Sequence, residues 1–199
     1  MLLLAHTGIT LAVTRVVEKA IVCRGIRNFP DLIDYRLVLV GSMLPDIIDK
    51  PLGGIILKES LGNGRIYSHT LLFLLFLLGI GLFFWCKYKL SCFLVLAGAS
   101  LFHHILDGMW LSPVTFLWPA LGWSFKKGDP ENWLLHWMKC LFNDPHVYVP
   151  EIIGGIIILY FGVKLISQKN LLEFIIRARR LTNNSIANKC SKWLDFKIS

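Results

Sequence analysis

The chain has 199 residues, of which 55% are hydrophobic, and its mean hydropathy of +0.59 is too high for an ordinary soluble domain. Its length suits a single domain. The net charge of +8 at pH 7 could suggest a nucleic-acid partner, but the basic residues are grouped beside apolar segments. That grouping is typical of a membrane protein, so no nucleic-acid partner is needed to explain the charge.

Five apolar stretches are candidate membrane segments: residues 2–22, 35–49, 66–86, 90–111 and 150–167. The third and fourth segments have the ~20 residues that are needed to cross a hydrocarbon core, and the fifth segment is slightly short. The first is apolar only to about Val13, and the second has a short apolar centre, so both need to pack against the stronger segments. The sequence therefore predicts an all-α, polytopic membrane helix bundle of about five segments.

Most of the 21 Lys and Arg residues lie in three regions: around residues 15–36, in the loop at 87–89, and from residue 164 onward. The positive-inside rule places these three regions together on the cytoplasmic side. The N-terminus is then outside and the C-terminus inside. We expect one integral domain over residues 1–167, a basic cytoplasmic tail over 168–199, and insertion in the lipid bilayer of the cell's inner membrane. The oligomeric state stays open.

Ionisable side chains in apolar segments are costly and usually mark a functional site. In this topology the segments alternate in direction, and each His or Asp within them falls near the outer end. The residues concerned are His6, Asp46, Asp49, His69, His103, His104 and Asp107. The sequence therefore predicts a polar His/Asp site at one end of the bundle.

Local spacing supports this prediction. His103 and Asp107 are four residues apart, and Asp46 and Asp49 are three apart, so on a helix each pair shares one face and can hold one ion. His104 points about 100° away from its neighbour, so at most one of the two histidines binds the ion directly.

Three imidazoles and three carboxylates suit one or two divalent metal ions, with Zn²⁺ preferred and Mn²⁺ or Fe²⁺ as alternatives. Taken singly, each residue has an ordinary explanation, such as a hydrogen-bonded packing histidine or an aspartate that ends a helix. As a set they favour a metal site. His136 and His146 lie among aromatic residues of the long outer loop, and we assign them to the membrane interface.

Five motifs occur in order: "AHTGIT", "GSMLPDIIDKPLGG", "GRIYSHTLL", "HHILDG" and "FLWPALGW". Over about residues 1–125 the chain thereby resembles the bacterial and archaeal membrane-bound metal-dependent hydrolases of the YdjM type. Family members often have His-Arg-Gly before the later His, whereas here Gly64 precedes Arg65, so any role of that extra His is absent. The resemblance implies the polar set His6, Asp46, Asp49, Arg65, His69, His103 and Asp107. The order of these residues is also distantly similar to zinc-dependent phospholipases C and P1-type nucleases.

The expected function is hydrolysis of a phosphoester or lipid-linked substrate at the outer membrane–water boundary. A metal lowers the pKa of a bound water, which then attacks the substrate. Asp49 is expected to act as general base or second-metal ligand, and Arg65 to bind a phosphate oxygen or the developing negative charge. The expected metal ligands are His6, Asp46, His69, His103 and Asp107.

Three non-enzymatic alternatives remain at this point. His69 with His103 or His104 could hold a haem, although haem iron has no use for the aspartates. Buried His and Asp residues could form a metal or proton relay, although their gathering at one end argues against a path across the membrane. A metal could also serve only to hold the outer end of the bundle together.

Overall fold

The computed structural model describes residues 3–26, 32–58, 60–127, 133–168 and 174, and within them every regular element is helical. The predicted all-α class is confirmed for this part of the chain. The long helices are α1 (Leu3–Cys23), α2 (Tyr35–Pro51), α3 (Leu71–Tyr88), α4 (Cys92–Leu106) and α7 (Pro145–Ser167). The shorter elements are a π-helical turn at Leu52–Ile56, a 3₁₀ turn at Met109–Leu111, α5 (Pro113–Phe116) and α6 (Trp133–Asn143).

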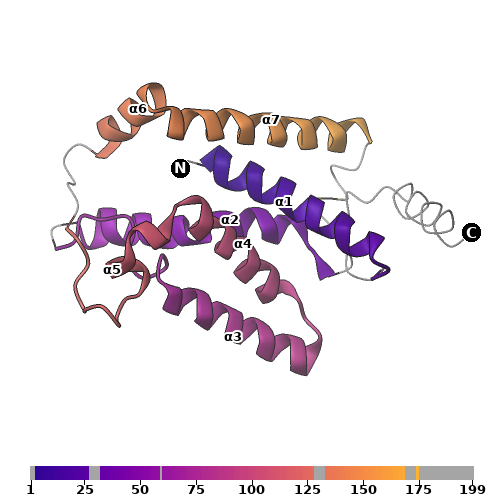
Figure 1. Ribbon diagram of the computed structural model, residues 1–199, viewed down its shortest axis with the longest axis horizontal. Coiled ribbons are helices and arrows are strands. Elements are labelled where there is room, and N and C mark those ends of the chain that lie inside the picture. Colours follow the sequence, from indigo (N-terminus) through magenta and orange to yellow (C-terminus); the bar gives the residue numbers. More distant parts are fainter. Residues whose placement is uncertain (1–2, 27–31, 59, 128–132, 169–173, 175–199) are drawn as a thin grey trace, which may run out of the picture.

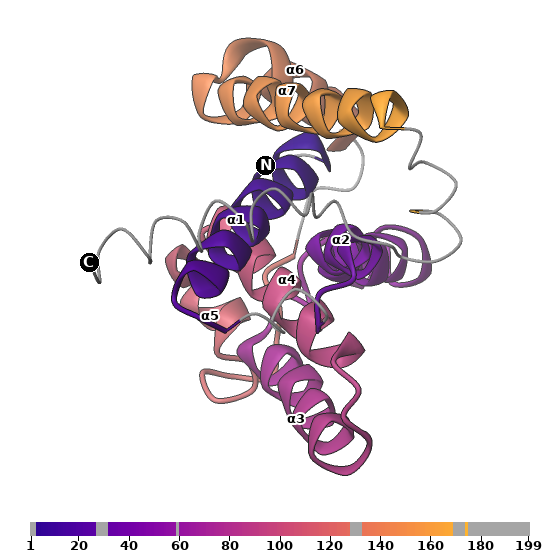
Figure 2. The same cartoon turned by 90° about the vertical axis from the view of Figure 1, so that its right-hand side faces the viewer.

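The helices are stacked so that α1, α2 and α4 lie in the middle (Figure 1). Helix α7, with α6 at its start, packs on the outer side of α1, and α3 packs on the opposite side against α4 (Figure 2). The helices that carry polar residues are therefore enclosed between two of the most apolar ones.

Each of the five predicted segments overlaps one long helix, but two of these helices begin elsewhere than expected. Helix α3 begins at Leu71, because the hydroxyl of Thr70 caps it by accepting the Phe73 N–H at 3.1 Å. Helix α7 begins earlier, at Pro145, where Asp144 accepts the His146 N–H at 2.9 Å and proline occupies the favoured first position.

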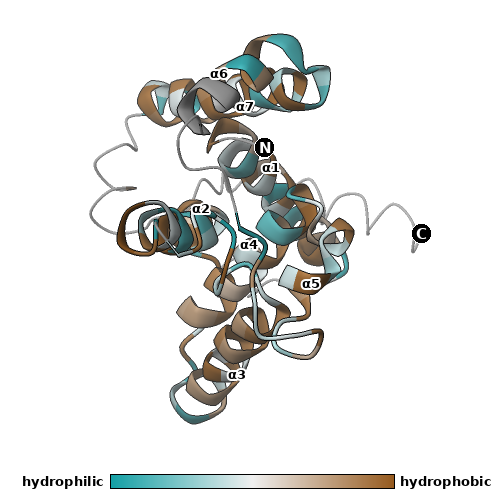
Figure 3. Ribbon diagram, turned by 90° about the vertical axis from the view of Figure 1, so that its left-hand side faces the viewer, coloured by the Kyte–Doolittle hydropathy of each residue, from teal (hydrophilic) through white to brown (hydrophobic). Residues whose placement is uncertain are grey.

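Two of the described helices, α3 and α7, are long and apolar enough to cross a membrane by length and composition. Helix α3 is strongly apolar over most of its length (Figure 3). Helix α4 is apolar but has 15 residues, about 22 Å of helix against a hydrocarbon core of about 30 Å. The predicted bundle of five membrane segments is therefore not confirmed. The predicted basic tail lies almost entirely outside the described residues.

Helix α1 is long enough to span, but it carries a buried pair of charges in its second half. Arg15 Nη1 lies 2.6 Å from Glu18 Oε2, and the hydroxyl of Tyr35, at the start of α2, donates to the same carboxylate. All three side chains are buried. Because each charge has a partner, the pair can be enclosed between α1 and α2 without an uncompensated charge.

The crossing of α1 and α7 brings their backbones almost into contact. A Cβ atom built on Gly154 would lie 2.1 Å from the carbonyl oxygen of Leu4, and one on Gly8 would lie 2.3 Å from that of Gly154. One turn earlier on α7, the buried carboxylate of Glu151 accepts the N–H groups of Leu4 and Ala5 at 3.0 and 3.2 Å. Helix α7 thus satisfies amides that the first turn of α1 cannot pair within itself.

Helices α2 and α4 also approach closely. A Cβ atom on Gly41 would lie 2.8 Å from that of Ala99, and the Ser100 hydroxyl donates to the Gly41 carbonyl at 3.0 Å. That carbonyl is four residues before Pro45, which has no N–H to donate to it. The proline therefore leaves α2 an acceptor that α4 uses.

The α1–α7 crossing generates a prediction with a neighbouring control. Gly154→Ala should lower the free energy of unfolding by about 1–3 kcal/mol, because its methyl group would overlap the α1 backbone. Gly155→Ala should be neutral or slightly stabilising, because its methyl group meets only the end of the Leu4 side chain at 3.5 Å and alanine favours a helix. Thermal unfolding in detergent measures both, and equal stabilities would contradict the close contact.

Candidate metal centre

The structure brings together the histidines and aspartates that the sequence singled out as a site. They come from the first turn of α1, the second half of α2, the loop before α3 and the end of α4. His6, Asp49, His69 and His103 have no exposed surface, and Asp46 is 5% exposed. The Asp107 side chain is 3% exposed, whereas Arg65 stands at the rim with 45% of its side chain exposed.

Two of the histidines are oriented by the partners of their Nδ1 atoms. His69 Nδ1 lies 2.7 Å from Asp49 Oδ2, and His103 Nδ1 lies 2.7 Å from the carbonyl oxygen of Ser42. Because a carboxylate and a carbonyl can only accept, each Nδ1 carries the proton. In neutral rings the Nε2 atoms then hold lone pairs, and these two atoms are 3.2 Å apart.

Carboxylate oxygens surround the two Nε2 atoms. Asp46 Oδ1 lies 3.6 Å from His69 Nε2 and 3.9 Å from His103 Nε2, and Asp107 Oδ2 lies 3.8 and 4.0 Å from the same atoms. Metal–nitrogen bonds of 2.0–2.1 Å place two tetrahedral ligands about 3.4 Å apart, close to the spacing found here. The four side chains thus present their donor atoms to one common point.

His6 lies beside this group. Its Nε2 atom is 3.1 Å from Asp107 Oδ1, and its ring stacks on that of His103 with centroids 4.1 Å apart. Donor atoms of two overlapping sets lie within 4.8 Å of one another, His6 with Asp46 and His103, and His69 with His103 and Asp107. His103 belongs to both sets, so the five ligands predicted from the sequence form one cluster.

Asp49 is placed behind the cluster. Its carboxylate accepts the backbone N–H groups of Ile66, Ser68 and His69 at 2.8, 3.0 and 3.2 Å, in addition to the contact with the His69 ring. The Ser68 hydroxyl donates to the Pro45 carbonyl at 2.7 Å and holds the same loop against α2. The loop is thereby fixed so that His69 Nε2 faces His103.

Two cations stand at the rim of the site. Lys50 Nζ lies 2.7 Å from Asp46 Oδ2, and Arg65 Nη2 lies 2.8 Å from Asp107 Oδ2. Gly64 packs against the Lys50 side chain, since a Cβ atom built on it would lie 3.5 Å from Lys50 Cγ. Sequence reasoning found Arg65 but missed Lys50, although its position four residues after Asp46 on one helix face was a usable signal.

The remaining histidines lie outside the ligand cluster or outside the described side chains. His104 is buried, and its Nδ1 lies 2.6 Å from the carbonyl oxygen of Ser100, with its ring centroid 6.1 Å from those of His69 and His103. His146 is exposed at the start of α7. His136 falls in α6, in a stretch whose side chains are not described.

The role of Asp49 generates a prediction. Asp49→Asn replaces one acceptor oxygen by an NH₂ group and leaves buried amides without a full set of acceptors, so the free energy of unfolding should fall by about 1–3 kcal/mol. Asp34→Asn, at the start of the same helix, is the control, because asparagine caps a helix as well as aspartate does, and the partly exposed ion pair with Arg36 that it gives up contributes little. Chemical unfolding of both variants in detergent measures the difference. If both variants lost the same free energy of unfolding, the result would contradict the hydrogen bonds to Asp49.

The comparisons with known proteins bear on the whole arrangement. No curated protein and no solved structure gives a significant match to the chain. A family model described as YdjM inner membrane protein matches residues 1–171, which include all five long helices and every residue of the cluster. The chain belongs to the YdjM inner membrane protein family.

Proposed function

We propose that the chain is a membrane-bound metal-dependent hydrolase that acts on a phosphoester. The observation that carries the proposal is the pair of imidazole Nε2 atoms 3.2 Å apart, each in a ring whose Nδ1 proton is already donated elsewhere. Two lone pairs facing each other at this distance repel, and nearby carboxylates add negative charge. A cation between them turns this repulsion into attraction.

The donor set fits a divalent ion. His69, His103, Asp46 and Asp107 would hold it, and His6 would complete the set. Nitrogen and oxygen donors in this mixture favour Zn²⁺, and Mn²⁺ or Fe²⁺ also accept them. An ion bound there supplies Lewis acidity and makes a water molecule a stronger nucleophile near neutral pH.

The contacts of Asp49 lead us to propose a role for it other than the predicted general base or second-metal ligand. Both of its oxygens already accept hydrogen bonds from the loop before α3. A carboxylate used in this way fixes the tautomer and direction of the ligating His69 and raises the basicity of that ring. Asp49 is therefore a positioning residue in this proposal.

The charges at the rim favour an anionic substrate. Asp46, Asp49 and Asp107 carry three negative charges, whereas a divalent ion with Lys50 and Arg65 carries four positive ones. The loaded site would therefore have an excess of positive charge, which suits a phosphoester. Arg65 and Lys50 are half-exposed, so they can reach a phosphate oxygen from the solvent side. With the N-terminal end outside, as the positive-inside rule predicts, a lipid headgroup could approach this rim.

The haem alternative has less support. Two axial imidazoles have to leave space between their nitrogens for the flat macrocycle, and His69 and His103 bring their Nε2 atoms to 3.2 Å. A metal that only holds the helix ends together would use the same ligands. Activity measurements on metal-loaded protein separate that alternative from catalysis.

Metal content is the first test. Detergent-purified protein should contain one or two equivalents of Zn²⁺ or Mn²⁺ by mass spectrometry, and His103→Ala and Asp107→Ala should each lose at least about tenfold in affinity. His146→Ala is the control, because His146 is an exposed histidine outside the cluster and should keep full occupancy. If folded wild type contained no stoichiometric metal, and the variants had the same metal content as wild type, the proposal would lose its basis.

Phosphoester hydrolysis tests the role of the rim. With bis(p-nitrophenyl) phosphate and with phosphatidic acid in mixed micelles, Arg65→Met should keep its metal but lose about 100-fold or more in kcat/KM. Lys50→Met should show a smaller loss in the same assay. Lys58→Met, outside the cluster, should keep full activity. If metal-loaded wild type hydrolysed neither substrate class nor other phosphoesters, the hydrolase would be rejected and a structural metal site retained.

A further inference from the structure

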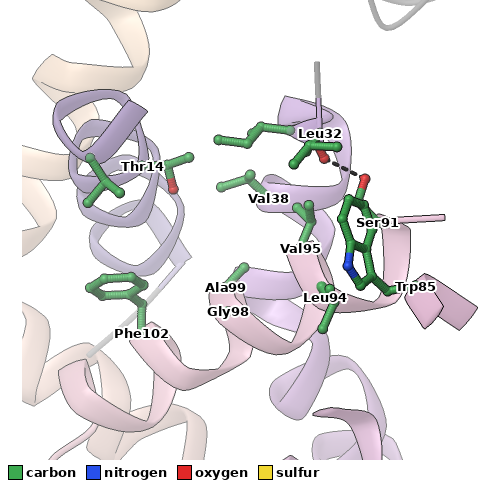
Figure 4. Close-up of a pocket in the computed structure, with 12 residues that line it drawn as sticks. Thr14, Leu32, Val38, Trp85, Ser91, Leu94, Val95, Gly98, Ala99 and Phe102 are labelled. Atoms are coloured by element: carbon green, nitrogen blue, oxygen red, sulfur yellow. Dashed lines mark hydrogen bonds between the residues drawn. The ribbon is translucent and has the colours of Figure 1, made fainter. Parts of the chain in front are cut away.

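A second candidate site lies on the same middle helices, away from the metal ligands. A half-open pocket of about 260 Å³ is lined by residues of α1, of the start of α2 and the two residues 32–33 before it, of the end of α3, and of α4 with the residue before it (Figure 4). Its wall is almost entirely apolar and includes Val38, Trp85, Leu94, Val95, Ala99 and Phe102. The hydroxyl of Ser91 already donates to the Leu32 carbonyl at 2.6 Å. No residue of the metal cluster lines it.

The shape and lining of the pocket suit a hydrocarbon chain. Ser91 and Phe102, which lie at its two ends on α4, are separated by about 16 Å of helix. Its apolar walls offer water almost no hydrogen-bond partners, so an apolar filler is favoured there over water. In a chain of an inner membrane family, the available apolar filler is a lipid acyl chain.

Gly98 provides a way in. It lines the pocket and is exposed, and a Cβ atom built on it would meet no atom within 4 Å. The surface of α4 is therefore uncovered at this residue. A chain can enter sideways there without unfolding a helix.

Positive charge lies at the Trp85 end. The ammonium group of Lys89, the residue that ends α3, is 5.9 Å from the Trp85 ring centroid, and Lys89 is exposed. An ammonium group at the end of an apolar pocket matches the phosphate of an anionic lipid. We propose that this pocket binds one acyl chain of an anionic phospholipid, whose phosphate contacts Lys89. This site is independent of the proposed hydrolysis.

Native mass spectrometry of the full chain in detergent tests the site, with phosphatidylglycerol and phosphatidylcholine of identical acyl chains as probes. Wild type should retain one phosphatidylglycerol per chain. At the same lipid concentration, the fraction of chains that retain phosphatidylcholine should be at least fivefold lower. Gly98→Leu should reduce phosphatidylglycerol occupancy at least fivefold, because its side chain fills the pocket. Lys89→Gln should remove the preference for phosphatidylglycerol.

Gly79→Leu is the matched control, because Gly79 is an exposed helical glycine of α3, equally open and not part of the pocket. It should bind lipid like wild type. Val17→Phe, on the α1 side of the pocket, repeats the occlusion if Gly98→Leu fails to fold. Equal lipid occupancy in the occluded variants and Gly79→Leu would overturn the proposal. So would a wild type that shows dimers but no retained phospholipid, because a second copy would then be the occupant.

Discussion

The carboxylate of Asp49 is the contact on which the geometry of the cluster depends. It accepts three backbone N–H groups from the loop before α3 and faces the ring of His69. The loop is not helical, so its amides have no carbonyl acceptors of a helix. Being buried, they need an acceptor from another part of the chain, and Asp49 provides it. Because α2 supplies the carboxylate, the loop is tied to α2. The imidazole then faces the one histidine that α2 orients through its own backbone, His103.

The sequence predicted the members of the cluster better than its supports. Apolar segments that alternate in direction, with His103 and Asp107 one turn apart, were enough to bring the ligands to one end. The carbonyl of Ser42 could not be found in this way, because every residue carries one and only packing decides which carbonyl meets a histidine. Glu151 was also missed, because it pairs with amides about 146 residues away in the chain. Helix α3 begins at Leu71 rather than near residue 66 because Thr70 caps it and because Asp49, on α2, accepts the amides before it.

The helices also differ in how far the apolar pattern of the sequence explains their place in the fold. The apolar pattern alone identifies α3 and α7 as long enough to span, whereas the polar helices α1 and α2 and the shorter α4 lie between them. Buried charged groups in this middle layer are paired with one another, as Arg15 and Glu18 are, or gathered in the proposed metal centre. The same layer holds the proposed lipid pocket along α4. A single helix thus carries a histidine of the cluster at one end and apolar pocket walls over the rest of its length.

The contact between Gly8 and Gly154 has a consequence for how a substrate could reach the cluster. Rotation or sliding of α1 against α7 would break the hydrogen bonds from the Leu4 and Ala5 amides to Glu151 and would push a side chain into the close backbone contact. His6 is therefore held from behind by a rigid support. The loop that carries His69 also carries Tyr67, whose ring contacts those of Trp118 and Phe125 in edge-to-face arrangements. Such rings can part without breaking a hydrogen bond between them, so the segment that carries Trp118 and Phe125 can move while Asp49 keeps the loop and His69 in place.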